Sequence, residues 1–66
     1  MELTVEQFLQ GKPAVYLALD GNLYVATYKC EDAIGHIDIR DTAGRRVMAP
    51  IANESFARTF FWNLDA

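Results

Sequence analysis

The sequence predicts an α+β fold: a small antiparallel sheet of about four strands, connected as a meander, with a short N-terminal helix and a C-terminal helix. Three observations predict it. Residues 4–7 carry a helix-capping pattern, the middle of the chain alternates apolar and polar residues between turn formers, and residues 54–64 are amphipathic. Because a chain of 66 residues buries only about 60% of its unfolded surface, we expect residues 1–66 to form a single domain.

The first predicted element is a helix over residues 5–10. Thr4 and Gln7 match a capping box, in which each side chain accepts a hydrogen bond from the other residue's backbone amide. Gly11 stands where a helix commonly ends in a left-handed residue. Six residues cannot hold a helix alone, so we expect Phe8 to pack against the core with its apolar neighbours.

A hairpin is predicted next, with Asp20, Gly21 and Asn22 as its turn formers. A three-residue loop with Asn22 left-handed would set Leu17 opposite Val25, whereas a two-residue loop would mix the two faces. One face would then hold Val15, Leu17, Leu19, Leu23 and Val25, and the other Ala14, Tyr16, Ala18, Tyr24, Ala26 and Tyr28. We expect the aliphatic face to point inward.

Two further strands follow a polar break at residues 29–35. The run from residue 35 to 41 alternates, with Ile37 and Ile39 on one side and His36, Asp38 and Arg40 on the other. Residues 41–44 have the composition of a type I turn.

Residues 45–49 then return as the last strand. Alternation places Val47 and Ala49 inward and Arg46 and Met48 outward. Pro50 cannot donate to a ladder, so this strand ends there or lies at an edge.

The C-terminal segment fits two structures. As a helix capped by Asn53 it places five apolar residues on one side and Trp62 nearly opposite. As a strand it would use the high β-propensity of residues 59–62. We favour the helix.

Composition narrows the classes of function. The chain is 52% hydrophobic with a net charge of −3, so general attraction to phosphate is weak and a nucleic-acid partner is disfavoured. One cysteine, Cys30, and one histidine, His36, allow neither an internal disulfide nor a Cys/His metal site. We expect a cytoplasmic protein without a membrane span or a cofactor. A regulatory role for Cys30 stays open.

No catalytic site is predicted. The lone Ser55 falls in the first turn of the C-terminal helix, where capping or solvation explains it. Cys30 and His36, or His36 and Asp38, form formal pairs, but a packing cysteine and a solvated strand face explain them more simply. We therefore expect a protein that is not an enzyme.

The predicted partner-binding surface is the outer face of the sheet. Interface cores are enriched in Tyr, Met and Arg, which this face would supply. Its residues, with nearby acids and the exposed Trp62, are Tyr16, Tyr24, Tyr28, Asp38, Arg40, Arg46, Met48, Glu31, Asp32, Asp41 and Trp62. Alternatively, a helix covers this side and the tyrosines are half-buried core.

These features predict a small protein-binding modulator that inhibits a larger nucleic-acid-handling or host-defence complex by occluding a surface. Phage and mobile-element inhibitors, such as anti-CRISPR and anti-restriction proteins, are of this size and character. In this hypothesis the acids compete with nucleic acid for a basic groove. One alternative is single-strand nucleic-acid binding by sheet tyrosines and arginines. A second is a self-assembling structural subunit, and a homodimer would also stabilise so small a chain.

Overall fold

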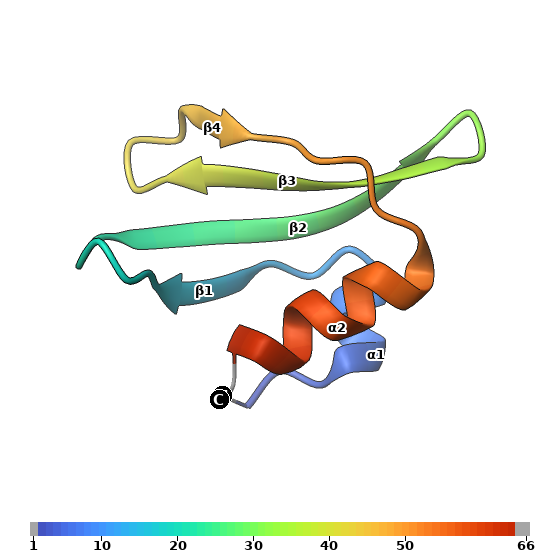
Figure 1. Cartoon of the computed structure of the whole chain (residues 1–66), viewed down its shortest axis with the longest axis horizontal. Helices are drawn as coiled ribbons and strands as arrows, with labels where there is room; N and C mark the ends of the chain where they lie inside the picture. Colours follow the sequence, from blue (N-terminus) through green and yellow to red (C-terminus); the bar gives the residue numbers. More distant parts are fainter. Residues whose placement is uncertain (1, 65–66) are drawn as a thin grey trace.

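A four-stranded antiparallel sheet with two helices against one face makes up the computed structural model, which describes residues 2–64 (Figure 1). The strands are adjacent in chain order, β1-β2-β3-β4, which confirms the predicted meander and the α+β class. The elements are α1 (Val5–Leu9), β1 (Ala14–Leu17), β2 (Leu23–Glu31), β3 (Ile34–Asp41), β4 (Arg46–Met48) and α2 (Glu54–Leu64).

Both helices begin at the predicted caps. The Gln7 amide donates to Thr4 Oγ1 at 3.2 Å and the Thr4 amide donates to Gln7 Oε1 at 2.9 Å, which completes the capping box of α1. Gly11 follows this helix with φ +100°. At α2 the Phe56 amide donates to Asn53 Oδ1 at 2.8 Å, so the helical prediction for this segment is confirmed.

The β1–β2 register differs from the prediction by two residues. Leu17 pairs with Leu23 rather than with Val25, and Gly21, with φ +86°, takes the left-handed position that we assigned to Asn22. Because side chains alternate with a period of two, this shift leaves the same strand residues together on each face.

Two tight turns connect the remaining strands. The β2–β3 hairpin turns at Asp32 and Ala33, whose φ values of 51° and 66° define the left-handed pair of a type I′ turn. The polar composition of residues 29–35 had predicted a break between strands here, whereas β2 and β3 continue up to the turn. The turn from Asp41 to Gly44 is as predicted, with the Gly44 amide donating to the Asp41 carbonyl at 3.0 Å.

A bulge interrupts the β3–β4 pairing. Arg40 pairs with Arg46 and Ile39 pairs with Met48, which leaves Val47 as the extra residue. Arg46 therefore points to the predicted face, but Met48 lies on the face of Ile39 rather than on the outer face. The inward orientation predicted for Val47 is also wrong, since its side chain is about half exposed.

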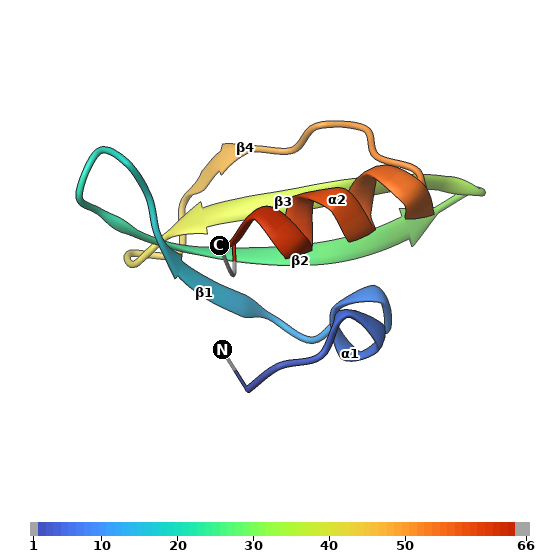
Figure 2. The same cartoon turned by 60° about the horizontal axis from the view of Figure 1, so that its bottom comes forward.

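The orientation of the sheet is the main correction to the prediction. The Ala/Tyr face, not the aliphatic face, points to the helices, and α2 lies across β2 and β3 on that side (Figure 2). Alternating small and large residues explain this choice: Ala14 and Ala26 pair directly and are fully buried, leaving room for helical side chains. The buried core consists of Phe8, Ala14, Ala26, Tyr28, Ile37, Ile39, Ala52, Ala57 and Phe61.

Candidate protein-binding face

The face of the sheet that points away from both helices, here called the open face, has no helix over it within residues 2–64 (Figure 2). Its side chains alternate along the strands with those of the core. The open face carries Val15, Leu17, Leu23, Val25, Thr27, Lys29, Glu31, Ile34, His36, Asp38, Arg40 and Arg46.

One half of the open face is aliphatic. We define the aliphatic patch as Val15, Leu17, Leu23 and Val25, two cross-strand pairs of β1 and β2. Leu17 is 68% exposed, and Val15 and Leu23 are about half exposed. Single exposed apolar residues are ordinary on a protein surface, but a contiguous group of this kind indicates a contact surface.

The other half of the open face is a basic cluster of Lys29, Asp38, Arg40 and Arg46. The Asp38 side chain is only 1% exposed, although it lies on the uncovered face. Its carboxylate accepts hydrogen bonds from Arg40 Nε at 3.0 Å and from Arg46 Nε at 2.9 Å, and Lys29 Nζ lies 3.5 Å away. Three cations and one carboxylate give this cluster a net charge of +2.

Asp38 stays ionised in this setting. Burial by itself raises the pKa of Asp38, but hydrogen bonds from Arg40 and Arg46, together with their charges, outweigh it and hold the pKa below its ordinary value. The cover over the carboxylate is thin, because it consists of three cationic side chains that are each about half exposed. The cluster is thus an ionised network at the surface.

The two halves adjoin along one row across the sheet. Val15 pairs with Val25, Val25 with Arg40, and Arg40 with Arg46. With strands about 4.8 Å apart, the row passes from the aliphatic patch at Val25 to the cation on β4 over about 10 Å. The open face therefore presents apolar and cationic chemistry side by side.

The tyrosines lie on the helix side, so the predicted docking face built on them is wrong and the alternative of helical cover is correct. Tyr28 is 9% exposed and belongs to the core. Tyr16 and Tyr24 are partly buried, with ring centroids 5.9 Å apart, and Tyr16 meets the ring of Phe60 edge-on at 6.1 Å.

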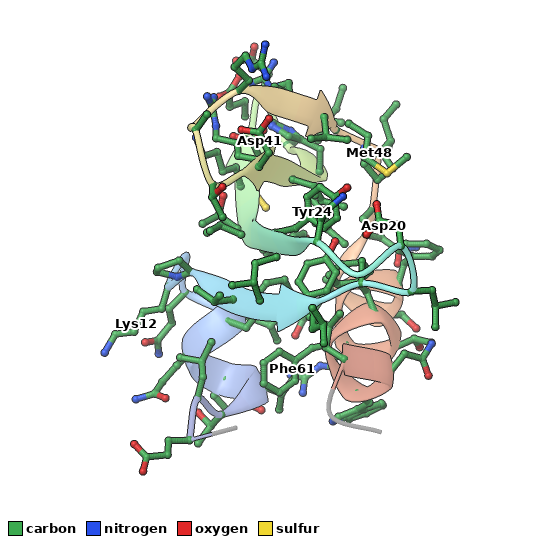
Figure 3. The ribbon with its side chains drawn as sticks, turned by 90° about the vertical axis from the view of Figure 1, so that its left-hand side faces the viewer. Lys12, Asp20, Tyr24, Asp41, Met48 and Phe61 are labelled. Atoms are coloured by element: carbon green, nitrogen blue, oxygen red, sulfur yellow. The ribbon has the colours of Figure 1, made fainter. Side chains whose placement is uncertain are left out.

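Tyr24 is held by an acid at the end of the sheet (Figure 3). Its hydroxyl donates to Asp20 Oδ2 at 2.6 Å. This hydrogen bond raises the pKa of Tyr24 and lowers the pKa of Asp20, since the bond stabilises the protonated phenol and the ionised carboxylate. The pair fixes the loop between β1 and β2.

The four acids named in the prediction are not brought together. Glu31 and Asp32 are exposed at the tip of the β2–β3 hairpin. Asp41 lies at the opposite end of the ladder, where it pairs with Tyr24, seven residues or about 23 Å along β2 from Glu31. Asp41 Oδ1 accepts the amides of Ala43 and Arg45, both at 3.0 Å. With Asp38 inside the basic cluster, these residues do not form one acidic surface.

Two predicted contact residues lie away from the open face. Trp62 is 57% exposed on α2, as the sequence predicted. Met48 is 54% exposed on the helix side of the sheet, beyond the cover of α2. Of the predicted set, the open face therefore holds Asp38, Arg40 and Arg46, with Glu31 at its hairpin end.

The formal pair of Cys30 and His36 does not assemble, whereas His36 and Asp38 share the open face and Asp38 is bound by Arg40 and Arg46. Cys30 pairs with Gly35 and Lys29 pairs with His36, so the Cys30 and His36 side chains point to opposite faces of the sheet. In the described part of the chain, no group of three or more His, Cys, Asp or Glu residues is placed to hold a metal ion.

Two shallow hollows, of about 340 and 480 Å³, flank the loop between β1 and β2. The larger one continues the aliphatic patch around the edge of the sheet towards α2. It is lined by Tyr16, Leu17, Ala18, Leu19, Asn63 and Leu64.

The sequence predicted inward positions for the four aliphatic residues and a polar break at Lys29, so none of the five was among the predicted site residues. Alternation did show that Val15, Leu17, Leu23 and Val25 share a face. Alternation does not show which face the helices cover, so the strand sequences alone could not predict that these four side chains are exposed.

Comparison with protein-family models, with curated proteins and with solved structures found no match. Within residues 2–64, none of the helices has the length and apolar composition that crossing a bilayer requires.

Proposed function

We propose that this chain is a non-enzymatic, protein-binding modulator that acts by covering a surface of a larger protein with its open face. The observation that supports the proposal is the exposure of the aliphatic patch directly beside the basic cluster, on a face without helical cover. Burying such a patch against a partner is the main source of free energy in protein association.

The composition of the open face resembles an interface more than a solvated sheet surface. A solvated strand face ordinarily alternates polar residues with the buried ones, whereas the paired residues of β1 and β2 are apolar on both faces. Arginine is also enriched at interfaces, because its guanidinium combines a flat apolar surface with several donors.

The partner in this proposal belongs to a nucleic-acid-handling or host-defence complex, as expected for a phage or mobile-element inhibitor of this size. The contact differs from the one first predicted. Asp38 and Asp41 are already engaged within the fold, so occlusion by the aliphatic patch replaces competition by free acids.

Single-strand nucleic-acid binding ranks behind this proposal. It requires exposed aromatic rings on which bases stack, and Tyr28 is buried while Tyr16 and Tyr24 face the helices. The arginines remain on the open face, but they adjoin aliphatic side chains.

The proposal is tested by capture from the native cell with a tagged chain. Wild type should retain a discrete protein, and Leu17→Arg should lose it because a charge then sits in the aliphatic patch. Trp62→Arg is the matched control, since Trp62 is similarly exposed but lies on α2. Circular dichroism checks that both variants fold. Retention by Leu17→Arg, or equal loss in both variants, would contradict the proposal.

A further inference from the structure

We infer that the surface recognised by the open face is both aliphatic and acidic, with carboxylates about 10 Å to one side of an apolar strip. This inference rests on the proposed function and specifies the chemistry of the partner. It follows from the row in which Val25 is succeeded across the sheet by Arg40 and then Arg46.

Charge complementarity is the first argument. The chain as a whole carries −3, whereas Lys29, Arg40 and Arg46 with Asp38 carry +2, so the remaining residues sum to −5. With Glu31 at the hairpin end, the open face as a whole carries +1, and its positive charge is concentrated in the basic cluster. Complementary charge orients an encounter and speeds it, and here it favours an acidic partner surface opposite the basic cluster.

Arg46 is the side chain best placed to meet a partner carboxylate. Arg40 is held at two points, since Nε donates to Asp38 and Nη1 donates to the Gly44 carbonyl at 2.8 Å. Arg46 donates through Nε alone within residues 2–64, and its side chain is 54% exposed. Its terminal nitrogens are therefore available for a paired contact with a second carboxylate.

A second copy of this chain fits the open face less well. A two-fold dimer that buried the whole face would bring the basic cluster near its own image. Of the two acids on that side, Asp38 is already bound by both arginines, and Glu31 lies at the hairpin tip, six residues along β2 from the partner of Arg40. A nucleic acid would meet the cations but would find aliphatic side chains where bases need aromatic ones. An acidic, leucine-rich protein surface would complement both the aliphatic patch and the basic cluster.

The test uses a synthetic helical peptide with a leucine stripe bordered by glutamate, because a helix with its side chains is about 10–12 Å wide and matches the row. Binding is measured by fluorescence anisotropy and mapped by amide shifts in NMR spectra. We expect the glutamate peptide to bind at the open face, and a matched peptide with lysine in place of glutamate to bind at least tenfold more weakly.

Two variants in the basic cluster should move the affinity in opposite directions. Arg46→Gln should weaken binding of the glutamate peptide about threefold to tenfold, because one charge-assisted contact is lost. Lys12→Gln, which removes the same charge from the side of α1 (Figure 3), should leave it within about twofold. Asp38→Asn should strengthen binding, because it removes the carboxylate that occupies the arginines.

Several outcomes would overturn the inference: equal binding of both peptides, tighter binding of an oligothymidine, or a dimer in light scattering that Leu17→Arg dissociates. If Leu17→Arg abolishes native capture while Arg46→Gln leaves the amount captured unchanged, the inference fails and the proposed function stands. If the glutamate peptide binds the open face but native capture ignores Leu17→Arg, the proposed function fails instead.

Discussion

Replacing Ala33 by glycine should stabilise this protein. Ala33 has φ +66° in the β2–β3 turn, a region that costs an L-residue roughly 1–2 kcal/mol and glycine nothing. Glycine also gains conformational entropy in the unfolded chain, which offsets roughly 0.5–1 kcal/mol of that relief. The net gain is therefore about 0.5–1 kcal/mol in the free energy of unfolding, or a rise of about 2–8 °C in Tm for a domain of this size.

Thermal unfolding followed by circular dichroism measures this effect, and urea titration confirms it at constant temperature. Ala43→Gly is the matched control, because Ala43 lies in the other tight turn and is not among the residues with positive φ. There the same substitution should cost about 0.4–1 kcal/mol through the unfolded state. If both variants lose stability equally, the type I′ assignment at Asp32 and Ala33 is refuted.

Three more predictions concern the network, the sheet and the core. Asp38→Asn should lower the free energy of unfolding by about 1–3 kcal/mol at pH 7, less than for a fully buried ion pair because the cations are half exposed. Since the pKa of Asp38 is lowered in the fold, the stability advantage of the wild type should persist above about pH 4 and be lost as the pH falls below that. A difference in Tm that stays constant down to about pH 2.5 would contradict this prediction. Gly35→Ala should cost about 1–3 kcal/mol in urea titrations, because a Cβ there would collide with the Ala52 carbonyl and the Tyr28 hydroxyl; unchanged stability would show that this packing is loose. Phe8→Ala should lower the free energy of unfolding by about 3–5 kcal/mol, which is comparable to the whole stability of a domain of this length. The dispersion of NMR amide signals should therefore collapse in this variant, whereas it should stay intact in Phe56→Ala, because Phe56 is half exposed.

The local elements of this fold were predictable from the sequence. The capping box of Thr4 and Gln7, the Asn53 cap and the turn from Asp41 to Gly44 depend on hydrogen bonds between residues three apart, so short segments of sequence contain both partners. The β2–β3 turn was missed because Asp-Ala is a poor type I′ sequence, and the long ladder on either side imposes the conformation.

The basic half of the candidate site was partly predictable and the aliphatic half was not. Alternation along β3 placed Asp38 and Arg40 on one face, and the structure confirms it. The ion pair between Asp38 and Arg46 depends on the bulge that brings Arg46 opposite Arg40. Because the bulge arises from the pairing of β3 with β4, the sequence of neither strand alone predicts it.

By itself the sequence determined which side chains share a face of the sheet, since that depends only on the two-residue period of a strand. Only the tertiary structure decided which face is buried. Both faces of β1 and β2 are apolar, so hydrophobicity alone did not distinguish the buried face from the exposed one. The helices pack on the face where Ala14 and Ala26 leave space for Phe8 and Phe61, because the large aliphatic side chains on the other face offer no such space. That packing choice exposes the aliphatic patch beside the arginines and thereby creates the candidate site.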